Sequence, residues 1–194
     1  IIAMKKIDAA IAAFDEYNQK GPTSIIWQGV TYATEYLYAI KLSEWVNKLA
    51  PEANEALLLA SRCQHIGRWE IARSAYPEGR VGYLKWRSDL SKFHAQKAGE
   101  IMLGVGYEAD MIKNVQDINL KKGLKVNQDV QIMEDALCLV FLEYQFEALI
   151  EKMTQEKMVD IVQKTWRKMS EQGRQFALEL SYSPKESEIL QLAL

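Results

Sequence analysis

The residues in this chain best suited to chemistry gather in one stretch, residues 60–98. The stretch holds both histidines of the protein, together with five arginines and two tryptophans. Imidazole titrates near neutral pH and ligates metal ions, whereas guanidinium binds phosphate and carboxylate groups in a planar, two-pronged geometry. The stretch therefore predicts acid–base or metal chemistry on an anionic ligand.

Three residues form the predicted catalytic and metal-binding centre. His65 lies one helical turn after Arg62 on the same face, and His94 lies on the apolar side of its helix. Asp135 opens the apolar segment 136–142, so its carboxylate is expected to be buried and to need a partner. A small helical bundle would bring these residues together in one polar pocket.

Two imidazoles and one carboxylate, His65, His94 and Asp135, could hold Zn²⁺, Mn²⁺ or Fe²⁺. Glu134 would be an auxiliary ligand, and Gln64 would orient water or substrate. If no metal binds, His65 could act as a general acid or base. Structural roles are the alternative, because a histidine on an apolar face is more often a core residue and a buried aspartate can simply pair with an arginine.

Cationic and aromatic residues around the histidines are the predicted binding groups for an anionic small molecule, a phosphate ester or nucleotide. They are Arg62, Arg68, Arg73, Tyr76, Arg80, Trp86, Arg87 and Lys122. The alternative is a solvated charged surface with tryptophans in the core. RNA is a less favoured partner, because the net charge of −2 argues against an extended basic surface.

Composition and periodicity predict a single all-α domain over residues 4–194. Apolar residues recur at helical spacing between few prolines and glycines, and no apolar run reaches the ~20 residues of a membrane-spanning helix. Cys63 and Cys138 lack CxxC spacing and are expected to be free thiols, which favours a cytoplasmic location. Residues 1–3, ahead of Met4, are expected to remain from cloning. The oligomeric state is left open.

Apolar periodicity and capping signals predict the helical segments and give approximate first and last residues for each. They cover residues 4–19, 32–49, 52–66, 81–104, 108–120, 128–152 and 155–180, with a last short helix after the capping box at 183–186. Residues 25–30 are expected to be extended or hairpin-like, and residues 68–80 are expected to be irregular or extended.

One segment, "CQHIGRWEI", resembles the signature of the HD superfamily, in which an apolar helix ends in His-Asp-Ile-Gly. Gln64 stands at the histidine position of that signature and His65 at the aspartate position. "KFHAQKAGE" resembles the next element of the superfamily, and "EDALCLVFL" resembles the last one, which carries the role of its aspartate onto Asp135. The remaining superfamily positions fall near Tyr38 and near Lys121 or Lys122. The resemblance implies an all-α, HD-like helical bundle that binds metal and supports phosphate-ester hydrolysis.

The whole chain from about residue 5 also resembles an uncharacterised family of bacterial and fungal proteins of unknown function. The shared blocks are the Gln-His-Ile segment, "WEI", "YP", "GYLKWR", "FHA" and "EDALCLVFLE". That family usually has proline where this chain has Ala72.

The leading hypothesis from the sequence is a metal-assisted hydrolase of a phosphate ester or nucleotide-like small molecule. The alternative is a catalytically silent nucleotide- or RNA-binding module on the same scaffold. A second alternative is an Fe-dependent oxygenase, because two histidines and one carboxylate also suit that chemistry.

Overall fold

Several helices begin at residues whose side chains cap free main-chain N–H groups, as the sequence predicts. The side chain of Asn54 accepts a hydrogen bond from the N–H of Leu57 at 2.9 Å. The side chain of Thr154 likewise accepts from the N–H of Lys157. Ser183 and Glu186 form the predicted capping box, with proline in the first helical turn.

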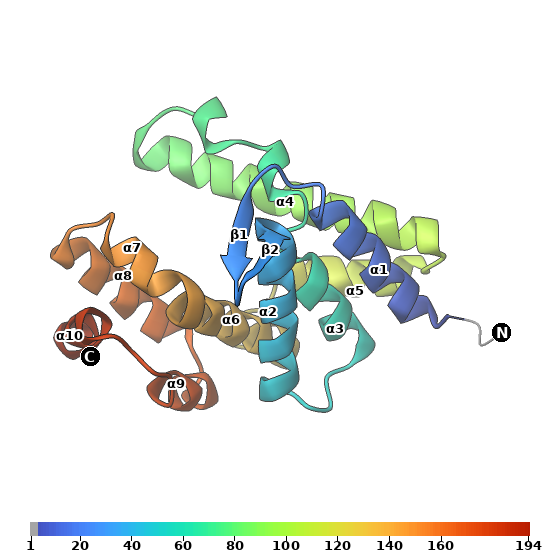
Figure 1. The fold of residues 1–194 in the computed structure, drawn as a ribbon. Coiled ribbons are helices and arrows are strands. Elements are labelled where there is room, and N and C mark those ends of the chain that lie inside the picture. The colour runs from blue at the N-terminus through green and yellow to red at the C-terminus, as the bar shows by residue number, and fades with distance from the viewer. Residues whose placement is uncertain (1–3) are drawn as a thin grey trace.

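The computed structural model describes residues 4–194, and the fold is all-α, which confirms the predicted fold class (Figure 1). The elements are α1 (Lys6–Asn18), β1 (Ser24–Trp27), β2 (Val30–Ala33), α2 (Thr34–Leu49), α3 (Glu55–Cys63), α4 (Gly79–Val105), α5 (Ala109–Asn119), α6 (Gln128–Val140), α7 (Phe146–Ile150), α8 (Gln155–Lys168), α9 (Glu171–Leu178) and α10 (Pro184–Ala193). Two short 3₁₀ turns, Arg68–Glu70 and Arg73–Ala75, occupy the segment expected to be irregular.

Three of the expected helices have different bounds from those predicted. The segment 155–180 is two helices, because Met169 is extended and Ser170 caps α9. The segment 128–152 contains a π-helical turn, Phe141–Gln145, between α6 and α7. The third helix starts at residue 55 rather than 52, because Asn54 supplies the cap after the turn at Pro51.

One hydrophobic core joins the helices. α2 packs against α3 and α6, α4 packs against α5, and α8 packs against α10. In Figure 1, α1, α3 and α5 lie on one side of α2, and α7 to α10 lie on the other. The largest fully buried side chains are Phe14, Val46, Leu57, Leu59, Ile66, Met102, Val115, Met133, Leu139, Leu142, Phe146 and Met158.

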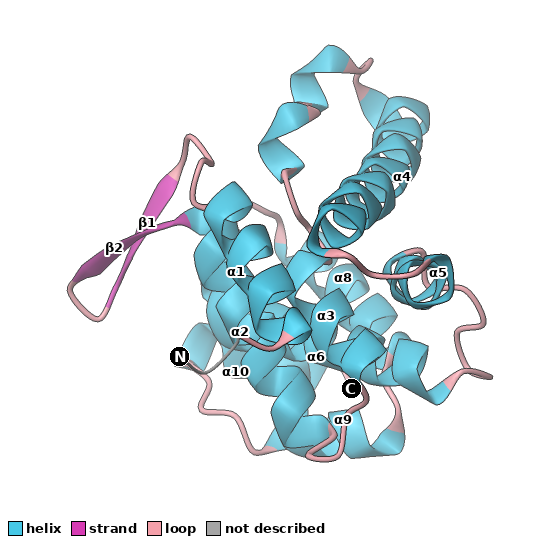
Figure 2. Ribbon diagram, turned by 90° about the vertical axis from the view of Figure 1, so that its right-hand side faces the viewer, coloured by secondary structure: helices cyan, strands magenta, loops and turns pink. Residues whose placement is uncertain are grey.

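The predicted extended piece is a two-stranded antiparallel hairpin that projects from the helical body (Figure 2). Its register pairs Ser24 with Ala33 and Trp27 with Val30. Trp27 contacts Tyr144 edge to face at 5.2 Å between ring centroids, and the Lys41 ammonium lies over both rings. The turn end of the hairpin is thereby fixed to the π-helical turn.

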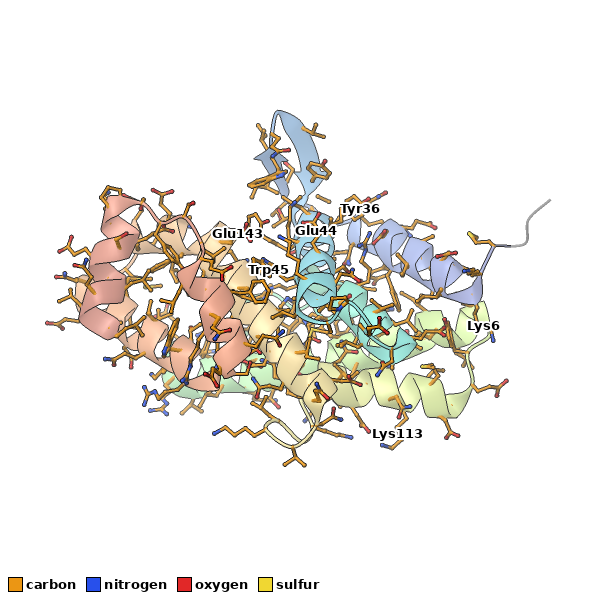
Figure 3. All side chains as sticks on the ribbon, turned by 90° about the horizontal axis from the view of Figure 1, so that it is seen from below. Lys6, Tyr36, Glu44, Trp45, Lys113 and Glu143 are labelled. Carbon is orange, nitrogen blue, oxygen red and sulfur yellow. The ribbon has the colours of Figure 1, made fainter. Side chains whose placement is uncertain are left out.

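The same π-helical turn is fixed to α2. The indole N–H of Trp45 donates to Glu143 Oε2 at 2.7 Å, and both side chains are labelled in Figure 3. Trp45 is buried, so the hydrogen bond satisfies a donor that would otherwise lack a partner.

The two cysteines are buried and unpaired, which confirms the predicted free thiols. Burial raises the pKa of both Cys63 and Cys138 to about 12, so neither thiol is activated as a nucleophile. Within residues 4–194, no helix is both long and apolar enough to cross a membrane. The expected cloning remnant, residues 1–3, lies outside the described residues.

Candidate functional site

The turn that follows α3 places His65 at the mouth of a small cavity. Ile66 is buried, and Gly67 has the left-handed φ of 64° that ends the turn. A Cβ at Gly67 would lie 2.9 Å from the ring of Tyr17 and 3.0 Å from that of Phe93, so α1 and α4 approach the main chain closely there. Ile66 and Gly67 therefore form this turn, and the turn places the preceding residue, His65, against the cavity.

His94 of α4 meets the same turn from the other side. Its side chain is only 4% exposed, and its Nδ1 donates a hydrogen bond to the carbonyl oxygen of Ile66 at 2.6 Å. A carbonyl can only accept, so the proton is on Nδ1 and Nε2 carries a lone pair. Among the described residues, no hydrogen-bonding group reaches that buried Nε2.

The structure brings the two histidines together, with ring centroids 5.7 Å apart. They share a cavity of about 50 Å³ between the end of α3, the middle of α4 and the end of α5. Its lining residues are Gln64, His65, Arg68, Arg87, Leu90, Ser91, His94, Asn119 and Lys121.

Gln64 lines this cavity, but its amide is held by Asn119. Gln64 Nε2 donates to the carbonyl oxygen of Asn119 at 3.2 Å, and Asn119 Nδ2 donates to Gln64 Oε1 at 3.1 Å. Both residues are buried. The amide pair fixes the end of α3 to the end of α5, which leaves Gln64 less free to orient a water molecule than the sequence-based hypothesis supposes.

The cavity is cationic. The Arg68 guanidinium lies 5.5 Å from the ring centre of Trp86. Burial lowers the pKa of Arg68, and the neighbouring charge of Arg87 lowers it further, while Glu35 has a weaker opposite effect. Lys121 pairs with the buried Glu134 at 2.6 Å. Within residues 4–194, neither Arg68 nor Arg87 has a carboxylate oxygen within 4 Å.

Burial, assisted by these charges, keeps the histidines neutral. Burial lowers the pKa of His94 to about 4, with Arg68 and Arg87 acting in the same direction and the hydrogen bond to Ile66 opposing it. The pKa of His65 falls well below its usual range, chiefly because of burial and then because of His94 and the surrounding cations. Near neutral pH both imidazoles are therefore uncharged, and each has a ring nitrogen that can accept a hydrogen bond.

Asp135 lies elsewhere, as a structural residue between α6 and the start of α9. It is 1% exposed, and its carboxylate accepts from the N–H of Ser170 at 2.8 Å, from the Ser170 hydroxyl and from Gln131 Nε2 at 3.1 Å. A Cβ at Gly173 would lie 2.7 Å from Asp135 Cγ, so α9 also packs directly against this carboxylate.

The predicted ligand set of His65, His94 and Asp135 is consequently not assembled. Over the part of the chain that the structure describes, no group of three or more His, Cys, Asp and Glu side chains is arranged to hold a metal ion. Glu134, the predicted auxiliary ligand, pairs with Lys121 and lies 3.9 Å from Lys168. The two imidazoles of the cavity face guanidinium groups rather than a carboxylate.

Arg62 points away from the cavity, toward α1. Its Nε and Nη2 donate to the two carboxylate oxygens of Asp15 at 2.7 and 3.0 Å, and both side chains are less than one-fifth exposed. A two-pronged pair of this kind is stronger than an ordinary surface ion pair. Its role is to join α3 to α1.

We expect a double-mutant cycle of Arg62→Leu and Asp15→Leu to give a coupling energy of about 1–2 kcal/mol in urea unfolding. The charge-assisted contacts are lost in either single variant, so the second substitution should cost little more. Additive effects would show that the pair contributes nothing to stability.

Most of the other predicted binding residues also lie away from the cavity, where they make hydrogen bonds or ion pairs of their own. Arg73 donates to the carbonyl oxygens of Tyr76 and Pro77. The Tyr76 hydroxyl donates to Asp89, and Lys122 pairs with Asp117. Arg80 is exposed and does not line the cavity. Trp86 is buried, donates to the carbonyl of Ile71 and supports the Arg68 guanidinium.

The predicted site residues do not include four of the cavity residues, namely Leu90, Ser91, Asn119 and Lys121. Ser91 precedes His94 by one helical turn, so its spacing would have revealed it. Asn119 ends α5 and Lys121 follows it, and helical spacing connects neither residue to the histidines, although the resemblance to the HD superfamily places a position near Lys121 or Lys122. Only the packing of α5 against α3 and α4 brings them there.

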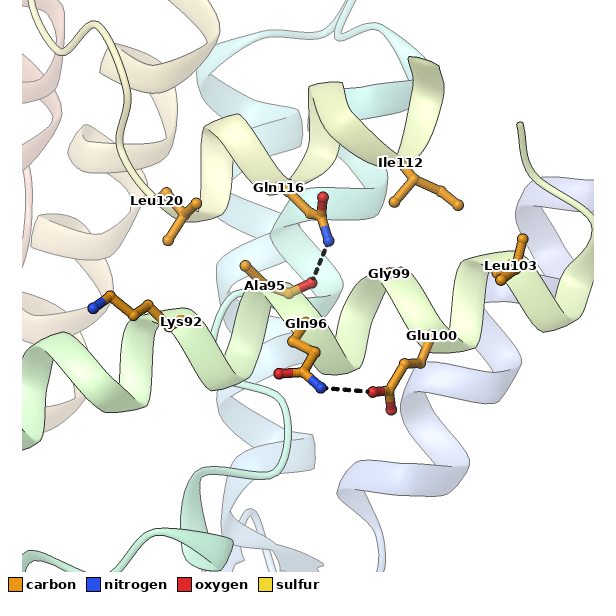
Figure 4. A pocket seen from close by; sticks show the side chains of 9 residues that line it. All are labelled: Lys92, Ala95, Gln96, Gly99, Glu100, Leu103, Ile112, Gln116 and Leu120. Carbon is orange, nitrogen blue, oxygen red and sulfur yellow. Dashed lines mark hydrogen bonds between the residues drawn. The ribbon is translucent and has the colours of Figure 1, made fainter. Parts of the chain in front are cut away.

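A larger hollow lies between α4 and α5 (Figure 4). Gln116 Nε2 donates to the carbonyl of Ala95 across its floor, and Gln96 donates to Glu100 at its edge. Its lining is mainly apolar and includes neither histidine nor any of the predicted binding residues. The smaller, cationic cavity is therefore the one that contains the predicted site residues Gln64, His65, Arg68, Arg87 and His94.

The fold and this cavity define an all-α bundle with a polar, cationic pocket at the junction of three helices. Residues 8–190 match a protein family described as "Domain of unknown function (DUF4202)", and the chain belongs to that family. No curated protein and no solved structure is detectably similar to the chain.

Proposed function

We propose that the cavity binds a small oxyanion, the phosphate group of a phosphate ester. The observation that carries this proposal is the convergence of Arg68 and Arg87 on two neutral imidazoles without a carboxylate within 4 Å of either guanidinium. Two adjacent cations repel each other, and a bound anion removes that cost and satisfies their N–H groups.

The size of the cavity favours one phosphate group over a whole nucleotide. About 50 Å³ holds roughly three or four water molecules. The remainder of an ester would lie outside, along the exposed side chain of Arg87. This supports the small-molecule class of ligand over RNA, whose binding would need a longer row of cations.

The residues present do not fit the metal that the sequence-based hypothesis includes. Two imidazoles are the available donors, and two guanidinium groups beside them oppose a divalent cation. The carboxylate of the oxygenase hypothesis, Asp135, is held by Ser170. Hydrolysis of a bound ester in this cavity would instead depend on His65, whose neutral imidazole can accept a hydrogen bond from the attacking water and orient it.

The test is calorimetric titration with inorganic phosphate and a panel of phosphate monoesters. Arg68→Gln and Arg87→Gln should each weaken the binding of the best ligand by roughly tenfold to a hundredfold, because one charge-assisted contact is worth ~1.5–3 kcal/mol. Arg80→Gln removes the same charge from an exposed residue outside the cavity and is the matched control.

Unchanged affinity in the two cavity variants would refute the proposal, as would a panel without any binding ligand. An equal loss in Arg80→Gln would place the ligand on the general surface instead. Release of inorganic phosphate from the best ester, abolished by His65→Gln, would assign hydrolysis to the same cavity.

A further inference from the structure

The unpartnered nitrogen of His94 is the feature of the cavity that anion binding alone does not explain. Its Nδ1 is fixed as a donor by the Ile66 carbonyl, so Nε2 is fixed as an acceptor. The ring is nine-tenths buried, and this nitrogen has neither exposed surface nor a partner among the described residues. A buried acceptor without a donor is costly.

The protein groups around the cavity leave this acceptor unsatisfied. Arg68, Arg87, Lys121 and Ser91 all carry donors and line the cavity, but none of them reaches His94 Nε2 within hydrogen-bonding distance. Gln64 and Asn119 donate to each other. His65 is partly exposed, so water can complete its hydrogen bonds. No described protein group supplies a donor to His94 Nε2, and a ligand that enters the cavity with its own O–H can supply one.

We infer that the cavity selects oxyanions that carry their own proton donor, with the ligand O–H donating to His94 Nε2 while its anionic oxygens face Arg68 and Arg87. This inference rests on the proposed anion site and makes His94 its specificity-determining residue. A singly protonated phosphate group or an acid with a neighbouring hydroxyl meets the requirement. A fully deprotonated tetrahedral oxyanion does not, because it would place a lone pair against the lone pair of Nε2.

Inorganic phosphate and sulfate can test whether the cavity requires an O–H donor on the ligand, because the two anions have nearly the same shape. At about pH 6, phosphate is mainly the monoanion and keeps O–H groups, whereas sulfate is a dianion without a proton. Charge alone favours sulfate in a cationic cavity. We expect the opposite order in calorimetric titration, with phosphate binding at least roughly tenfold more tightly, because a site built to hydrogen-bond a hydroxyl rejects analogues that lack it.

A pair of substitutions at His94 separates the two ring nitrogens. The amide nitrogen of His94→Asn can occupy the Nδ1 position and keep the bond to the Ile66 carbonyl, but the variant lacks Nε2. His94→Gln can place its amide oxygen where Nε2 was and so retains an acceptor. We expect His94→Asn to lose the preference for phosphate, and His94→Gln to retain most of it. Circular dichroism and urea unfolding would establish that both variants are folded.

The outcomes distinguish this inference from the proposed function. Equal binding of the two anions, or tighter binding of sulfate, overturns the inference and leaves the anion site standing. Preference for phosphate that survives unchanged in His94→Asn also overturns it, because the selection would then come from another group. Absence of binding for both anions overturns the inference together with the proposed function.

Discussion

Asp135→Ala is expected to lower the free energy of unfolding by about 3 kcal/mol and to leave anion binding in the cavity unchanged. The carboxylate holds the first turn of α9 through both the main-chain N–H and the hydroxyl of Ser170. Without it, those donors and the amide of Gln131 lose an acceptor in a buried environment. Urea denaturation of the purified variant measures the loss, and phosphate titration measures the affinity.

Asp160→Ala is the matched control, because that aspartate pairs with Lys164 on the exposed surface of α8 and should contribute less than ~1 kcal/mol. Gly173→Ala tests the same junction independently, since its added methyl would collide with the Asp135 carboxylate. If the Asp135→Ala variant were stable but no longer bound phosphate, the prediction would be wrong, and Asp135 would have a role in anion binding.

The sequence was sufficient to predict the helices and the pairing of the two histidines in one polar site. Helical periodicity reflects which face of each segment is buried, and the capping residues mark the ends of the segments. His65 lies in the turn after α3 and His94 lies on α4, the next α-helix along the chain, so their proximity required little knowledge of the tertiary fold. The all-α prediction succeeded for the same reason, because local patterns determine most of it.

The role of Asp135 could not be inferred from the chain in the same way. An aspartate at the start of an apolar helix is expected to be buried, and that expectation is correct. Its partner, Ser170, is separated from it by α7 and α8, inside a segment that periodicity predicts as one continuous helix. The break at Met169 exposes the N-terminus of α9, which then requires an acceptor. Failure to predict the break also concealed the partner.

Arg62 illustrates a second reason for error. Spacing places it one turn before His65 on the same helical face, but a guanidinium group at the end of a long side chain can turn to either neighbouring helix. The Asp15 carboxylate on α1 determines the direction, and only the packing of α1 against α3 brings that carboxylate within reach. Charged residues near a site in sequence are therefore weaker indicators than the helix ends that converge on it.

Acid is expected to destabilise the protein through His94, and His94→Asn should remove much of that dependence. The pKa of His94 is about 4 in the folded protein, whereas an ordinary histidine, such as one in the unfolded chain, has a pKa of 6.5. Between these values the unfolded chain binds a proton that the folded protein excludes, so stability increases with pH across this interval. The contribution is fully present above pH 6.5 and is lost as the pH falls toward 4. The direction is the same for His65.

The shift of His94 corresponds to about 3 kcal/mol across the interval, which is large for one side chain because the buried imidazolium would face Arg68 and Arg87 as well as lose its hydration. Urea unfolding at several pH values, performed on the parent and on His94→Asn, isolates this contribution from the titration of the carboxylates that both proteins share. Parallel stability curves for the two proteins would contradict a buried, neutral His94. A curve that flattens in the variant would show that the cavity keeps the imidazole uncharged, which is the state in which His94 Nε2 can accept a hydrogen bond from a ligand O–H.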